Sequence, residues 1–277
     1  MLPHPHQNHD FQPHVCECEL KLIPSRDFGG GSNPLQHLDH VLNMSSQASK
    51  MPNPPPTKIT VLISGNGSNL QALIDASVTT MPHLQIIRVI SNRKQAYGLS
   101  RAEKASIPTL YHNLIAGKYL AAGEKDPSAQ QLGREKYDAD LADLVLADSP
   151  DLVVCAGWLH ILAPSFVDPL SAKNLPVINL HPALPGMYDG INAIERAYKD
   201  FQDGKLKNGR TGIMVHYLIS EVDRGTPILV REIECRTGET LDELTERIHE
   251  HEHQIIVEGT AMAIIKLWEE RTGGSQK

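Results

Sequence analysis

The segment that most constrains the fold is an apolar run that passes directly into a glycine-rich turn. Residues 59–63, Ile-Thr-Val-Leu-Ile, predict a buried strand, and Ser-Gly-Asn-Gly-Ser-Asn follows at 64–69 before an apparent helix at 70–76. A strand, a glycine-rich turn and a helix start in succession are typical of an α/β protein. This order also suits an anion, because glycines let the backbone approach it and free helical N–H groups face it.

The turn predicts a site for one phosphate rather than for a dinucleotide. The dinucleotide pattern G-x-G-x-x-G would need glycine where Leu70 stands, and the strand predicted at 85–90 ends in Ser91 and Asn92 instead of an acidic residue. The alternative is a structural turn that one of its own side chains caps. The residues expected to hold the phosphate are Gly67, Ser68 and Asn69.

The rest of the chain continues the alternation of strands and helices. Its 277 residues, 40% of them hydrophobic, allow a sizeable α/β core, and folding is expected to begin at residue 58. A small, polar segment at 117–126 predicts an inserted loop. Further strands are predicted at 151–157, 176–178, 211–219 and 227–234, and helices at 96–105, 128–147, 192–203 and 240–269, the last as one helix or two, with another starting at Pro164.

A second polar feature follows the apolar run Pro-Val-Ile at 176–178. Alternate residues of an extended chain share a face, so Asn179 and His181 point the same way and Leu180 points into the core. Pro182 then ends the strand, at the edge where open α/β sheets place their sites. An amide can donate to an oxyanion and an imidazole can move a proton near neutral pH, so the pair favours acyl or formyl transfer. The alternative is a buried, hydrogen-bonded structural pair.

Composition excludes several classes of protein. A formal net charge of −7 argues against a broad basic surface for nucleic acid. The sequence has no run of 18 apolar residues and no targeting pattern in its first thirty, so no membrane and a cytoplasmic location are expected. The four cysteines, which show no disulfide framework, agree with a reducing compartment; they are Cys16, Cys18, Cys155 and Cys235.

The chain divides at about residue 57. Residues 1–57 hold six histidines, a triple glycine and a triple proline without helical or strand periodicity, and predict a disordered extension before a catalytic domain at 58–277. Cys16 and Cys18 lack the spacing of a metal site. His-Glu-His-Glu-His at 249–253 satisfies H-E-x-x-H, but no further ligand follows at the protease spacing. No metal is therefore expected.

Four motifs together resemble one family. They are S-G-N-G-S-N-L at 64–70, A-G-W-L-H-I-L at 156–162, I-N-L-H-P-A-L-P at 178–185, and V-H-Y-L-I-S-E-V-D-R-G-T-P-I-L at 215–229. In this order and spacing they resemble the phosphoribosylglycinamide formyltransferase family of purine synthesis over about residues 58–270. The resemblance implies an α/β, three-layer Rossmann-like formyltransferase fold with a mostly parallel central sheet.

The resemblance also implies roles for individual residues. Asn179, His181 and Asp223 would be the catalytic trio, although from the pattern alone Asp223 is an ordinary turn former. Glu252 would lie near glycinamide ribonucleotide, whose phosphate the glycine-rich turn would hold. Arg134, by its pattern a solvated helix residue, would contact folate. The folate contacts implied are Arg134, Leu159, His160, Ile161, Leu162 and Asn179.

The implied co-substrate is 10-formyltetrahydrofolate and the acceptor is the primary amine of glycinamide ribonucleotide, in a monomer or homodimer. The chain departs from the commonest family pattern at His160, where arginine is frequent, and in Ala-Leu-Pro-Gly-Met-Tyr-Asp-Gly at 183–190. Three alternatives stay open: a formyltetrahydrofolate hydrolase, a methionyl-tRNA formyltransferase, and a non-catalytic sugar-phosphate-binding protein. The second would carry a further β-rich domain, and only 54 residues follow Asp223 here.

Overall fold

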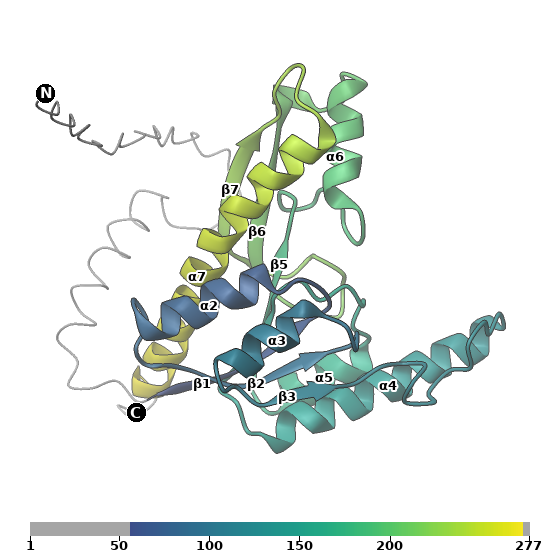
Figure 1. The fold of residues 1–277 in the computed structure, drawn as a ribbon, viewed down its shortest axis with the longest axis vertical. Helices are drawn as coiled ribbons and strands as arrows, with labels where there is room; N and C mark the ends of the chain where they lie inside the picture. The colour runs from purple at the N-terminus through teal and green to yellow at the C-terminus, as the bar shows by residue number, and fades with distance from the viewer. Residues whose placement is uncertain (1–55, 274–277) are drawn as a thin grey trace, which may run out of the picture. The chain divides into compact units, whose positions relative to one another are not determined.

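The computed structural model describes residues 56–273, which contain a sheet in the order β3-β2-β1-β4-β5-β6-β7 (Figure 1). Strands β1 to β5 are parallel, β6 is antiparallel to β5, and β7 is antiparallel to β6. The strands are β1 (Thr57–Ile63), β2 (Leu84–Ser91), β3 (Thr109–Tyr111), β4 (Leu152–Cys155), β5 (Val177–His181), β6 (Arg210–Tyr217) and β7 (Pro227–Glu234). The predicted extension at 1–57 lies outside the described residues except for its last two, and β1 already includes Thr57.

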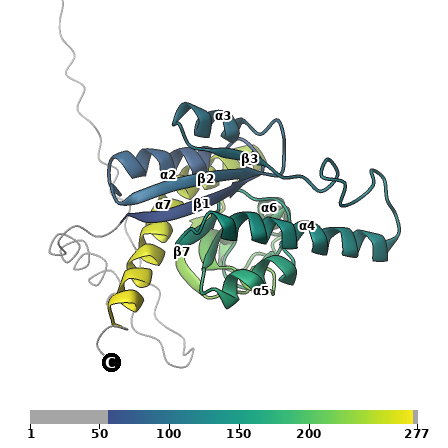
Figure 2. The ribbon, with the colours of Figure 1, turned by 90° about the horizontal axis from the view of Figure 1, so that it is seen from below.

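Helices cover both faces of the sheet. Helices α2, α6 and α7 pack on one face and α4 and α5 on the other, and Figure 2 shows α2 and α3 opposite α4 and α5. The predicted three-layer α/β fold with a mostly parallel sheet is confirmed. The helices are α2 (Ser68–Val78), α3 (Tyr97–Lys104), α4 (Pro127–Ala147), α5 (Pro164–Ala172), α6 (Ala193–Gln202) and α7 (Leu241–Gly273), with a short 3-10 turn at Lys207–Gly209.

Strand β4, at the centre of the sheet, is apolar throughout because both of its faces are buried. In β4, Leu152 and Val154 pack into the core beneath α2 and α7, whereas Val153 and Cys155 pack into the core beneath α4 and α5. Cys155 and Cys235 are free thiols.

Among the described helices, none has an apolar stretch that could span a bilayer, not even the 33-residue α7.

One open expectation is resolved and one element is new. The segment at 240–269, expected as one helix or two, forms one continuous helix, α7. Strand β3 was not predicted, because three residues after Pro108 are too few to show a period of two. β3 pairs with β2 as a parallel strand at the edge of the sheet, so it does not change the order of the strands that carry the site.

We predict that Gly259→Ala, normally a stabilising change inside a helix, destabilises this protein. A Cβ at Gly259 in α7 would lie 2.8 Å from both Cβ and Cγ1 of Val215 in β6. The expected loss in unfolding free energy is about 1–3 kcal/mol from overpacking, against the gain of about 1 kcal/mol that alanine usually brings. Urea denaturation measures it, with the exposed Glu246→Ala as control; a stabilised Gly259→Ala would contradict the packing of α7 on β6.

Candidate active site

The register between β5 and β6 builds the first half of the site. The two strands pair antiparallel, with Asn179 opposite His216 and His181 opposite Met214. Asn179 and His216 therefore meet on one face of the sheet, where Asn179 Nδ2 lies 3.3 Å from His216 Nε2. As predicted, Leu180 is buried in the core between the two polar residues of β5.

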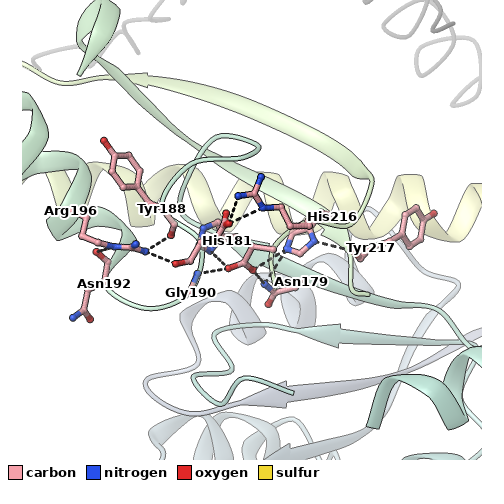
Figure 3. Close-up of polar contacts among 11 residues, drawn as sticks. Asn179, His181, Tyr188, Gly190, Asn192, Arg196, His216 and Tyr217 are labelled. Carbon is pink, nitrogen blue, oxygen red and sulfur yellow. Dashed lines mark hydrogen bonds and ion pairs between the residues drawn. The ribbon is translucent and has the colours of Figure 1, made fainter. Parts of the chain in front are cut away.

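Asp223 completes the cluster from the connection between β6 and β7. Its carboxylate accepts the Gly190 N–H at 2.7 Å, and Figure 3 shows the surrounding polar contacts. Asp223 Oδ2 lies 3.4 Å from His181 Nδ1. Its Oδ1 lies 3.4 Å from both Asn179 Nδ2 and His216 Nε2. The three residues expected to form the trio are thus in one place, together with a second histidine.

Burial and the neighbouring carboxylate act on His181 in opposite directions. Burial lowers the pKa of His181, Asp223 raises it, and His216 lowers it, so that the net pKa lies below its ordinary value. Burial raises the pKa of Asp223, but hydrogen bonds from His216 and Gly190 bring it below its ordinary value. His181 Nε2 is buried and has no hydrogen-bond partner among residues 56–273. The anionic Asp223 carboxylate therefore lies beside Nδ1 of a neutral His181 ring. The other ring nitrogen, Nε2, is unpartnered in the described chain.

His216 is a site residue that the sequence analysis did not single out. Its Nδ1 lies 3.0 Å from the Tyr217 carbonyl oxygen, to which it can donate. With Nδ1 protonated alone, Nε2 accepts from the Asn179 amide; with both nitrogens protonated, Nε2 donates to Asp223 instead. Which nitrogens of the His216 ring carry a proton therefore decides whether both N–H groups of the Asn179 side chain are hydrogen-bonded within the cluster. The available signal was the strand pattern around V-H-Y, which becomes informative only with the register to β5.

The glycine-rich turn forms an anion cradle at the start of α2. Gly67 has φ +74°, and a Cβ there would lie 2.5 Å from Gly98 Cα, so the turn requires glycine. The first helical hydrogen bond runs from the Gln71 N–H to the Gly67 carbonyl, which leaves the N–H groups of residues 68–70 without a partner in the described chain. No side chain caps α2. The structure thus leaves these donors available to a ligand, as a phosphate site needs.

Arg101 in α3 holds the cradle in shape. Its Nε donates to the Asn66 carbonyl at 3.0 Å, and its other nitrogens contact Asn66 Oδ1 at 2.9 Å and Gln71 Oε1 at 3.2 Å. The guanidinium adds positive charge beside the free N–H groups. The sequence analysis did not identify Arg101, because it lies 35 residues from the turn it contacts.

A buried pair lies across the site from the trio. Asn69 Nδ2 donates to Glu252 Oε2 at 3.1 Å, and Asn69 Oδ1 is buried without a partner. Burial raises the pKa of Glu252 above its ordinary value, while the bond from Asn69 opposes this shift. His249 and Arg93, which the sequence analysis did not select, line the same cavity. This end of the site is polar and can recognise both carboxamide and amine groups.

One cavity of about 500 Å³ joins these parts. Most predicted residues line it: Asn69, Leu159, His160, Ile161, Leu162, Asn179, His181, Asp223 and Glu252. Leu159 and Ile161 are 59% and 49% exposed and present an apolar surface there. Arg134 is exposed on α4 and Gly67 and Ser68 form the turn, and none of these three lines the cavity. A hollow of about 670 Å³ lies next to this cavity, against Ser64, Gly65 and Asn66 of the glycine-rich turn, and one of about 450 Å³ lies against Arg236 and Arg247. Neither contains the trio, so chemistry rather than size selects this cavity.

The nominal H-E-x-x-H segment lies on α7 and its Glu252 faces the cavity. Within residues 56–273 no three His, Cys, Asp or Glu side chains gather at the spacing of a metal site. Glu252 instead accepts a hydrogen bond from the Asn69 side-chain amide.

Comparisons with known proteins agree with this geometry. Residues 57–260 match the family model described as formyl transferase. The phosphoribosylglycinamide formyltransferase of Schizosaccharomyces pombe is 48% identical over 202 residues, which cover 72% of this chain and 93% of that relative. The protein of the same name from Saccharomyces cerevisiae is 45% identical over 214 residues, covering 76% and 98%.

A solved structure with a similar name also matches this chain in fold. Glycinamide ribonucleotide transformylase 1 from Symbiobacterium toebii aligns with a TM-score of 0.59 at 31% identity, covering 73% of this chain and 85% of that one. The family model spans most of the chain, and both named relatives are aligned over nearly their whole length. The chain therefore belongs to the formyl transferase family.

Proposed function

We propose that this chain transfers the formyl group of 10-formyltetrahydrofolate to the primary amine of glycinamide ribonucleotide, a step of de novo purine (IMP) synthesis. One observation carries the proposal: a single cavity is lined by the Asn179, His181 and Asp223 cluster, by an apolar segment and by a buried amide–carboxylate pair. The names of the relatives agree with it.

Each part of the cavity suits one part of the two substrates. Leu159 and Ile161 offer apolar surface to the flat rings of the folate, and the backbone N–H groups of residues 160–162 have no partner within the described chain to compete for them. The N–H groups of residues 68–70 would bind the ribonucleotide phosphate, and Glu252 its glycinamide group. The formyl carbon and the attacking amine would then meet beside His181. Binding both substrates at once removes much of the entropy barrier.

The cluster supplies the proton transfers. As the amine attacks, a C–N bond forms and negative charge grows on the formyl oxygen, to which Asn179 donates after exchanging one of its two long internal hydrogen bonds. His181 is neutral in the free chain, so its unpartnered Nε2 accepts the proton that the amine loses. Asp223 stabilises the resulting imidazolium through Nδ1. His181 then passes the proton to the departing folate nitrogen as the C–N bond to it breaks.

Several finer points belong to the same proposal. The catalytic domain is residues 58–277, the partners are the two small molecules, and the protein acts in the cytoplasm as a monomer or homodimer without a metal. Arg134 would contact the outer, acidic end of a folate that extends beyond the cavity, since it is exposed on α4 and forms no ion pair within the described chain.

The full chain is expected to release tetrahydrofolate from 10-formyltetrahydrofolate only when glycinamide ribonucleotide is present. The absorbance change on release gives the rate, and mass spectrometry identifies the formylated ribonucleotide. Equal release without the ribonucleotide would mean a hydrolase. Binding of the ribonucleotide without any release would mean a non-catalytic sugar-phosphate-binding protein, and either result would contradict the proposal.

Asp223→Asn is expected to lower kcat by roughly 10²-fold, because the imidazolium loses its counter-ion. The carboxylate raises the pKa of His181 against the effect of burial, so its loss should move the His181 titration to still lower pH. NMR titration of the histidines measures this, with His181→Ala for assignment and Asp203→Asn, in an exposed ion pair, as control. A titration above the ordinary value of about 6.5 in the unsubstituted protein, or near-normal kcat in Asp223→Asn, would refute the assignment.

A further inference from the structure

Asp138 is a buried carboxylate that the mechanism above does not use. It lies on α4, its side chain is 0% exposed, and it belongs to a helix on the opposite face of the sheet from α7. Asp138 Oδ1 lies 2.9 Å from His160 Nε2, and Oδ2 accepts the Ala163 N–H at 2.8 Å. Both partners belong to the segment at 157–163, which forms the apolar side of the cavity. One carboxylate therefore fixes the middle and the end of this segment.

Ser64 fixes the beginning of the same segment. Its N–H donates to the Gly157 carbonyl at 2.9 Å, and its Oγ accepts the Leu159 N–H at 2.9 Å. Residues 157–163 are not part of a helix or strand. Hydrogen bonds to the Ser64 and Asp138 side chains therefore satisfy backbone N–H groups that regular secondary structure would otherwise pair. Leu159 and Ile161 consequently point outward to the cavity, while Leu162 is only 7% exposed and packs into the core.

The His160 ring is held on a second side by aromatic packing. Its ring lies edge-on to Tyr137, with centroids 5.1 Å apart, and Tyr137 in turn stacks on His112 at 4.3 Å. The Tyr137 hydroxyl donates to the His112 carbonyl oxygen at 3.1 Å. Asp138 and Tyr137 are adjacent on α4, so this helix presents both the acceptor and the wall that orient His160.

We propose that Asp138 is a positioning residue for formyl-folate, acting through His160 and the Ala163 N–H to present the segment at 157–163 to the ligand; this rests on the proposed function. A buried carboxylate is costly, and a well-packed apolar side chain is often as stable, so stability alone does not account for it. Its two hydrogen bonds go to the His160 side chain, which lines the cavity, and to the Ala163 N–H, which follows the cavity-lining Leu162. Among the described residues, the Asp138 carboxylate bonds to His160 and Ala163 and not to Asn69 or Glu252, so its effect is specific to the folate side of the cavity.

The test compares variants of the full chain by calorimetric titration with tetrahydrofolate and, separately, with glycinamide ribonucleotide. Asp138→Ala removes both bonds and is expected to weaken tetrahydrofolate binding about tenfold or more, with ribonucleotide binding changed less than about twofold. Asp138→Asn keeps the shape and can bond to both partners through its oxygen and its amide, so it should restore most of the affinity. Asp143→Ala is the control, because Asp143 is exposed on the same helix, α4.

His160→Leu is the second variant and carries the test if Asp138→Ala does not fold. It loses one of the two bonds at a partly exposed position and should weaken tetrahydrofolate binding at least about threefold, while His160→Arg, which can still donate to Asp138, should not. A folded Asp138→Ala with unchanged folate affinity, or with equal losses for both ligands, would overturn the proposal. If the unsubstituted protein does not bind tetrahydrofolate at all, the proposed function fails as well, which separates the two failures.

Discussion

The site depends on where the chain places one carboxylate, that of Asp223. After the parallel strands β1 to β5, β6 runs back antiparallel and ends at Tyr217, which pairs with Ile178 of β5. The connection to β7 that follows then brings Asp223 to Asn179 and His181. Gly225 passes so close to β6 that a Cβ would lie 1.6 Å from the Tyr217 carbonyl oxygen. Asp223 itself has φ 54°, a conformation that aspartate tolerates better than most residues. A parallel crossover at this point would carry a helix away from the site instead.

The same connection also holds the loop that follows β5. Asp223 accepts the Gly190 N–H, and its neighbour Arg224 pairs with Asp189 at 2.6 Å. Arg196 in α6 donates to the carbonyl oxygens of this loop, including that of Asp189 at 2.8 Å. Movement of the loop at 183–192 would therefore disturb the carboxylate behind His181. The position of this loop and the electrostatics of the site are coupled through these hydrogen bonds and this ion pair.

Local pattern predicted the parts of the site that depend on neighbouring residues. The strand period and Pro182 placed Asn179 and His181 correctly, and the glycine-rich turn was found from its own residues. The parts that depend on pairing between distant segments could not be predicted in the same way. His216 reaches the cluster only through the register of β5 with β6, and Asp138 reaches the folate side only through the packing of α4. Spacing along the chain contains neither relationship.

The most direct test of this account is a crystal structure of the full chain with glycinamide ribonucleotide and tetrahydrofolate bound together. The account predicts the folate rings against residues 159–162 and the phosphate at the N–H groups of residues 68–70. It also predicts the ribonucleotide amine within about 3.2 Å of His181 Nε2, the distance that proton transfer needs. Ligands bound outside this cavity, or an amine too far from His181 to reach it even through one water, would contradict it.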